Sequence, residues 1–181
     1  MTSEPKAVNF DRMKEPAGVF AFRWKYVSLP LLMLLLSVVL TAVFYGRLPF
    51  PVAYHFQPGG APDKWAIPGL FILWMLVPQF LLTFGAIALT FIISRVAVRF
   101  LDPKSIVIDP RRIMLLTGNM VALAQIILVY ALLDIFLYNT AQKHLGISLL
   151  IFALIVMLVG GIILGAFFVR MMKQVLASNK K

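Results

Sequence analysis

The acid and imidazole groups that could carry chemistry are few in this sequence. The 181-residue chain has seven acids, two histidines (His55 and His144) and no cysteine. Asp134 is the only acid within a long apolar segment, where a carboxylate costs about 2.5–3.5 kcal/mol and therefore faces the interior of a helix bundle. Such a group could serve as a proton or cation relay, as a polar contact for a ligand, or as a structural tie between a helix and a loop. We favour the structural tie, because the position lies near the membrane interface, within reach of water.

The sequence predicts neither a metal site nor a cofactor. His55 and His144 could join Asp63 or Asp134 in a set of two imidazoles and one carboxylate, but no short ligand spacing supports such a site. The sequence also lacks HExxH, GxSxG and a phosphate-binding glycine loop. We therefore predict that the protein is not an enzyme, and a hydrolase that uses His55 is the weakest of the hypotheses.

Other polar and small residues fall inside the apolar segments. Gln79 and Gln125 lie near the middle of two of them, where amides more often join helices than line a pathway. Gly161 and Gly165 form a GxxxG pair, at which two helix backbones can approach closely. For this pair we favour packing within the monomer over self-association. Ala86, Thr90 and Ser94 form a stripe of small residues that suits close helix contact.

Four apolar runs position these residues. The chain is 61% hydrophobic and 13% charged, and each run exceeds the roughly 18 residues that mark a membrane-spanning helix. The fold class predicted is thus an all-α integral membrane protein with four transmembrane helices and an ordered extracytoplasmic loop. The predicted spans are 27–45, 68–93, 114–138 and 147–169. They are flanked by a tail and interfacial segment at 1–26, by the loop 46–67 and by a basic tail at 170–181. Asp109, followed by Pro110, is the expected N-cap of the third helix.

The positions of the basic residues predict the orientation. Fourteen of the 17 Lys and Arg residues fall in the N-terminal segment, in segment 94–113 and in the C-terminal tail. The positive-inside rule then places both termini in the cytoplasm and loop 46–67 outside. Attraction to the lipid bilayer explains the net charge of +10 without nucleic acid as a partner.

Loop 46–67 is rich in proline, glycine and aromatic residues and is expected to fold back over the helix ends. Its first part, 52–56, alternates apolar and other residues as a short strand does. Pro58-Gly59-Gly60 predicts a turn. Residues 62–65 are expected to lead into the second helix, with Asp63 as a possible cap and Trp65 as an interfacial anchor.

The spacing of this loop resembles a known pattern. The matching residues are Leu48, Pro49, Val52, His55, Phe56, Gly60, Pro62, Asp63 and Trp65. They resemble the loop after the first transmembrane helix of the SdpI-like family of bacterial membrane proteins, which includes immunity proteins against a secreted toxic peptide. Ala53 and Gln57 depart from the family's proline and asparagine. The resemblance implies a shared module in the bacterial plasma (inner) membrane more securely than it implies toxin immunity.

Asp134 needs a hydrogen-bond donor at the outer end of the third helix. His55, Arg47 and Lys64 are the donors that loop 46–67 can supply, and Lys143 competes from the next loop. We therefore predict that His55, Asp63 and Trp65 form a structural tie centred on Asp134.

These observations leave two main hypotheses on function. The leading one is a non-enzymatic interaction protein that recognises a peptide or protein partner with loop 46–67. It would act in immunity or signalling, or as an accessory subunit of a larger membrane complex. The alternative is a small transporter or channel assembled as a homo-oligomer, with Asp134, Gln79 and Gln125 as its intramembrane polar groups.

Overall fold

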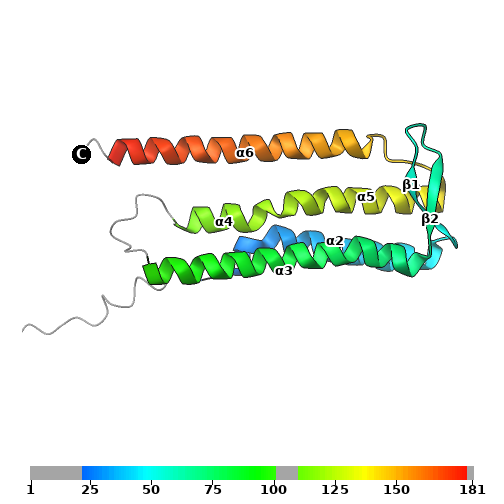
Figure 1. The fold of residues 1–181 in the computed structure, drawn as a ribbon, viewed down its shortest axis with the longest axis horizontal. Coiled ribbons are helices and arrows are strands. Elements are labelled where there is room, and N and C mark those ends of the chain that lie inside the picture. The colour runs from blue at the N-terminus through cyan, green and yellow to red at the C-terminus, as the bar shows by residue number, and fades with distance from the viewer. Residues whose placement is uncertain (1–21, 101–109, 179–181) are drawn as a thin grey trace, which may run out of the picture.

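The computed structural model of the chain describes residues 22–100 and 110–178, and within them four helical segments are long and apolar enough to cross a membrane. They run side by side, with a two-stranded hairpin across one end (Figure 1). The long helices are α2 (Ser28–Phe44), α3 (Pro68–Phe100), α4 (Pro110–Met120) with α5 (Ala122–Ala141), and α6 (Leu149–Ser178). Short 3-10 turns, η2 (Trp24–Val27) and η3 (Tyr45–Arg47), flank α2.

The two ends of the bundle differ in charge. We call the end crossed by the hairpin the hairpin end, and the opposite end, where α2 and α4 begin and α3 and α6 end, the basic end (Figure 1). Described basic residues near the basic end are Arg23, Lys25, Arg95, Arg111, Arg112, Arg170 and Lys173. The hairpin end has three, Arg47, Lys64 and Lys143.

The third apolar segment is not one continuous helix. A turn at Val121 separates α4 from α5, and α5 continues to Ala141, beyond the predicted end at residue 138. Gly118 and Asn119, both weak helix formers, precede the interruption. The predicted cap, Asp109, lies outside the described residues. Pro78, by contrast, lies inside α3 without ending it.

Small residues allow a close crossing near the basic end. Ala86, Thr90 and Ser94 are all buried, which confirms the predicted stripe for close contact. Opposite them, a Cβ built on Gly118 would lie 2.1 Å from the Tyr26 carbonyl oxygen and 2.8 Å from Thr90 Oγ1. Only glycine leaves room for this approach of α4 to η2 and α3.

Gln79 of α3 and Gln125 of α5 meet in the middle of the bundle. Each amide nitrogen donates to the backbone carbonyl of the other residue, at 3.3 and 3.2 Å, and Gln125 also donates to Thr83 Oγ1 at 2.9 Å. Both side chains are buried, and neither Oε1 atom has a hydrogen-bond partner among the described residues. The two side chains therefore join α3 to α5 through hydrogen bonds inside the bundle.

Helix α6 is the least embedded of the four segments. In its most apolar stretch of 18 residues only 6% is buried inside the protein, against 22–33% in the corresponding stretches of the other three segments. The main neighbour of α6 is α5. The close contact runs through Gly160, whose Cβ would lie 2.4 Å from Leu123 Cδ1. Gly161 and Gly165 are exposed and face open space. Among the described residues the GxxxG pair therefore lacks the packing within the monomer that we favoured, and self-association through it stays the open alternative.

The loop between α2 and α3 forms an antiparallel hairpin of β1 (Val52–Phe56) and β2 (Pro62–Ala66). The expected strand at 52–56 and the turn at 58–60 are both present. Residues 62–65 were expected to lead into the helix, and that expectation was wrong. They pair with β1, with Ala53 opposite Trp65 and His55 opposite Lys64, and α3 begins only at Pro68. Asp63 consequently caps no helix.

The inner side of the hairpin rests on the helix ends. Val52 and Ala66, one from each strand, are buried in a cluster with residues of α3 and α5. The helical members of this cluster are Phe71, Leu132, Ile135 and Phe136. Burying such side chains contributes roughly 1.5–3 kcal/mol each in water, and this contact holds the hairpin against the bundle.

Candidate functional site

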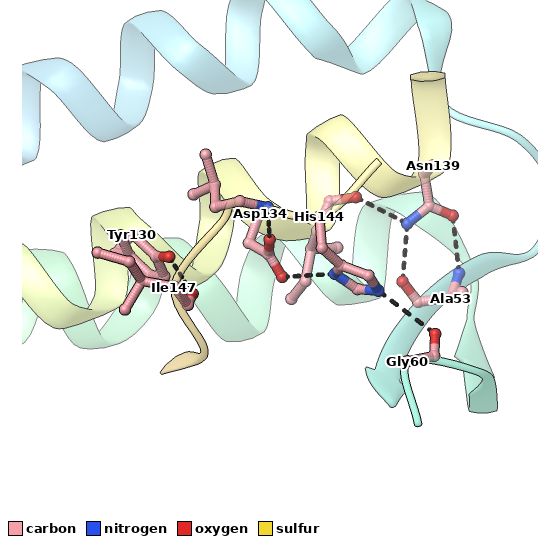
Figure 2. Close-up of polar contacts among 9 residues, drawn as sticks. Ala53, Gly60, Tyr130, Asp134, Asn139, His144 and Ile147 are labelled. Carbon is pink, nitrogen blue, oxygen red and sulfur yellow. Dashed lines mark hydrogen bonds and ion pairs between the residues drawn. The ribbon is translucent and has the colours of Figure 1, made fainter. Parts of the chain in front are cut away.

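The candidate site lies between the hairpin and the C-terminal end of α5, and Asp134 of α5 is one of its polar groups. Asp134 Oδ1 accepts a hydrogen bond from the backbone N–H of Leu145 at 2.6 Å, and Oδ2 lies 3.0 Å from His144 Nδ1 (Figure 2). Gln142, at φ 53°, ends α5 in the left-handed conformation and bonds back to the Tyr138 carbonyl. This αL ending reverses the chain and brings His144 and Leu145 back over the helix.

His144 connects this carboxylate to the hairpin. Its Nε2 lies 3.3 Å from the carbonyl oxygen of Gly60, in the hairpin turn (Figure 2). Both partners of the ring are acceptors, so only the doubly protonated imidazolium donates to the two at once. The ring also stacks on Tyr138, at 4.7 Å between centroids, and meets the edge of Phe56 at 4.6 Å. Gly60 has φ +83°, a conformation that favours glycine, so its carbonyl direction is fixed by the turn.

Asn139 makes a second connection between α5 and the hairpin. Its Oδ1 accepts from the Ala53 N–H at 2.9 Å, and its Nδ2 donates to the Ala53 carbonyl at 2.7 Å and to the Ile135 carbonyl at 2.9 Å (Figure 2). The amide thus pairs with one residue of β1 as a neighbouring strand would. Sequence reasoning missed Asn139. The one available signal was an amide at the end of an apolar segment next to a loop with strand character.

The predicted partnership of His55 with Asp134 is wrong. His55 Nδ1 instead lies 2.5 Å from Asp63 Oδ1, across the hairpin, and the two side chains are 54% and 29% exposed. Within residues 22–100 and 110–178, His144 is the only basic side chain within 4.0 Å of Asp134, so Arg47, Lys64 and Lys143 do not supply its donor. The tie between the helix end and the hairpin exists, but His144 and Asn139 form it.

The remaining residues of the predicted loop pattern take different positions. Val52 is buried beneath the hairpin, whereas Trp65 is 52% exposed. Phe56 packs edge-on against Tyr138, at 4.6 Å between centroids. Leu48 is half-buried beside the hairpin core and Pro49 is exposed. Pro62 begins β2.

A cavity of about 490 Å³ opens between the hairpin, α5 and the start of α6. It is lined by His55 and Gln57 from the hairpin and by Asp134, His144 and Ile147 from the other side. Ile147, which lines the cavity, accepts a hydrogen bond at its carbonyl from the Tyr130 hydroxyl (Figure 2). The volume falls within the roughly 300–1,000 Å³ range of ligand pockets.

The lining of this cavity combines polar and aromatic side chains. Among the described residues, no three His, Cys, Asp or Glu side chains gather as metal ligands. His55 and Gln57 place polar atoms on the hairpin wall, while Tyr54 and Phe56 supply aromatic surface. A mixture of apolar walls with a few polar groups binds and orients a ligand. The free edge of β2 is less suited than the cavity to bind a partner. Pro62, Asp63 and Lys64 are residue types that protect an edge strand against pairing with another chain.

The three polar residues of the transporter hypothesis do not lie together. Asp134 belongs to the hairpin end, and Gln125 lies nine positions earlier on the same helix, about 13 Å along its axis. Gln79 and Gln125 are buried against each other. No family model, no curated protein and no solved structure matched the chain in the three comparisons with known proteins.

Proposed function

We propose that this is a non-enzymatic membrane protein that recognises a peptide or protein partner with the hairpin and the cavity beneath it. The observation that carries the proposal is the cavity of about 490 Å³, which has polar groups on two walls and the aromatic side chains of Tyr54 and Phe56 in its lining. The likeness of the loop to the SdpI-like module supports the same reading. An immunity, signalling or accessory-subunit role would each use such a surface.

The hairpin is held firmly enough to present a defined surface. Asn139 pairs with both backbone groups of Ala53, and His144 contacts the turn carbonyl of Gly60. A surface that is ordered before binding loses less conformational entropy when a partner arrives. Outside these contacts, Phe50 and Trp65 are 77% and 52% exposed. Exposed aromatic residues suit both a membrane interface and a protein partner.

The orientation of the chain is part of the proposal. The excess of basic residues at the end opposite the hairpin supports a cytoplasmic position for both termini. The hairpin would then face the outside of a bacterial plasma membrane, where it meets secreted or membrane-bound partners. Labelling of single cysteines at Gln57 and Val96 from the outside tests this, with reaction expected at position 57 alone.

Photo-crosslinking from the cavity tests recognition. A photoreactive phenylalanine analogue replaces Gln57, which lines the cavity, and in a matched strain it replaces Gln142, which is exposed at the same end but does not line the cavity. We expect an adduct of one defined mass from position 57 only, weakened by His55→Ala in the same chain. Equal adducts from both positions, or no adduct from position 57 in the native host, would contradict the proposal.

A further inference from the structure

A second, larger hollow lies at the basic end, between α4 and α6, far from the hairpin. It is a groove of about 780 Å³. Its walls are mainly apolar, with Leu116 on α4 and Ile163, Ala166 and Phe167 on α6. The two helices do not pack directly against each other here, because α6 takes α5 as its main neighbour.

The groove extends from Leu123 to Arg112 and Arg170. Gly160 of α6 comes into close contact with the Leu123 side chain, and we call the other end, at the two arginines, the open end. Leu123 lies at the start of α5, just past the turn at Val121, and Arg112 lies eleven positions earlier on α4, which is about 16 Å at the rise of a helix. One leaflet of a bilayer has a hydrocarbon depth of about 15 Å, half of the ~30 Å core. The groove therefore has the length of one acyl chain.

Two guanidinium groups flank the open end. Arg112 comes from the first turn of α4 and Arg170 from α6, so they enter from opposite walls. No acidic side chain of the described ranges lies within 4.0 Å of Arg170. The two other polar side chains of the groove bond within the fold. Ser28 donates to the Lys25 carbonyl, and Asn119 accepts from the Leu29 N–H and donates to the carbonyls of Lys25 and Leu115. Among the described residues, Arg170 thus brings to the mouth of the groove a positive charge that has no acid beside it.

We propose that the groove binds one anionic phospholipid, with an acyl chain along α4 and α6 and its phosphate between Arg112 and Arg170. Guanidinium groups bind phosphate oxygens in pairs of parallel hydrogen bonds. Basic pockets between transmembrane helices are the sites at which anionic headgroups are held. An apolar helix from a second copy would fill the walls but would leave Arg170 against hydrocarbon without a counter-charge, which is costly. A phospholipid fits both features, because its acyl chain contacts the apolar walls and its phosphate supplies the counter-charge for Arg170.

Native mass spectrometry of the full chain in mild detergent tests this with added phosphatidylglycerol and, separately, phosphatidylcholine. We expect one retained phosphatidylglycerol per chain and little phosphatidylcholine. Arg170→Gln should weaken retention about fivefold, the effect of one basic residue on anionic lipid. Ala166→Trp, which leaves the charge unchanged but fills the groove, should abolish retention. Ile163→Trp is a second filling variant should the first fail to fold.

Arg95→Gln is the matched control, because it removes one positive charge from the basic end outside the groove. It should leave the retained lipid in place. Equal weakening by Arg95→Gln and Arg170→Gln would show diffuse attraction to the basic end and overturn the site. If both tryptophan variants still retained phosphatidylglycerol, the acyl chain would not lie in the groove, and the proposal would be overturned. Displacement of the lipid by glycerol phosphate alone would assign a free-phosphate site instead and also overturn the proposal.

Discussion

Asp134 and His144 lie ten positions apart and meet across the turn that ends α5, with Oδ2 3.0 Å from Nδ1. The same imidazole reaches the Gly60 carbonyl of the hairpin turn. One ring therefore connects an acid of α5, the loop before α6 and the loop between α2 and α3. This connection leads to the first prediction.

Asp134→Asn and His144→Ala should each lower the stability of the protein by about 1.5–2 kcal/mol, the lower part of the range for hydrogen bonds to charged groups, because both side chains are partly exposed. Their effects should not add, since partners in one network couple by about 0.5–3 kcal/mol. Thermal midpoints in detergent for the single and double variants measure the coupling. The control pair, Asp134→Asn with His55→Ala, should add, and additive losses in the first pair would show that the His144 contact is not formed.

Asn139→Leu should loosen the hairpin more than it destabilises the helices. The substitution leaves the N–H and carbonyl of Ala53 without their side-chain partners, which costs about 1–3 kcal/mol for each group that stays buried. Hydrogen exchange at Ala53 should accelerate while exchange in the middle of α5 changes little. Thr140→Ala is the matched control, because the Thr140 hydroxyl donates only to the Phe136 carbonyl of its own helix. Equal acceleration in both variants would contradict the role of Asn139.

Gly118→Ala and Gly161→Ala should have opposite effects. A methyl group on Gly118 would lie 2.1 Å from the Tyr26 carbonyl oxygen, so α4 must move away from η2, at a cost of about 1–3 kcal/mol or more. A methyl group on Gly161 meets open space, and alanine is the better helix former by up to about 1 kcal/mol. The thermal midpoint should therefore fall in the first variant and hold or rise in the second. A lowered midpoint for Gly161→Ala would point to a partner helix on that face.

Gln79→Leu should change the stability by less than about 1 kcal/mol, in contrast to Asn139→Leu. The lost bond is worth about 0.6 kcal/mol on average within membranes, and the substitution also removes a buried Oε1 that has no partner among the described residues. The substitution removes the hydrogen bond that Gln79 donates to the backbone carbonyl of Gln125. This carbonyl lies inside α5 and remains part of the helix. Equilibrium unfolding in mixed micelles measures the difference, and a loss of several kcal/mol would assign the amides a larger role.

The long helices could be predicted from the sequence because apolar runs of this length have few other structures in a membrane, where every backbone group needs an internal partner. The same reasoning could not find the turn at Val121, since α4 and α5 are both continuous with one apolar run. The close crossing at Thr90 was visible as a stripe of small residues. Its partner, Gly118, lies in another segment of the chain, and nothing in the sequence pairs the two.

The site was harder to predict, because its contacts depend on chain reversals. His144 reaches Asp134 only because Gln142 adopts a left-handed conformation, which glutamine rarely does and which no sequence pattern indicates. Residues 62–65 contain Pro62 and Asp63, types typical of helix starts, and pair as a strand because β1 lies opposite them. His55 consequently contacts Asp63 within the hairpin, and His144 forms the contact between Asp134 and the hairpin.

The shallow burial of α6 has a consequence for biogenesis. All the groups that fasten the hairpin, from Ala53 to Asn139 and His144, precede α6 in the chain, as does the Ile147 carbonyl that receives the Tyr130 hydroxyl. The ribosome therefore synthesises every group that fastens the hairpin before it synthesises the last helix. Since α6 adds its own contacts mainly to α5, the first three spans can close around their polar connections in the insertion machinery, and the fourth arrives on a surface that is already built.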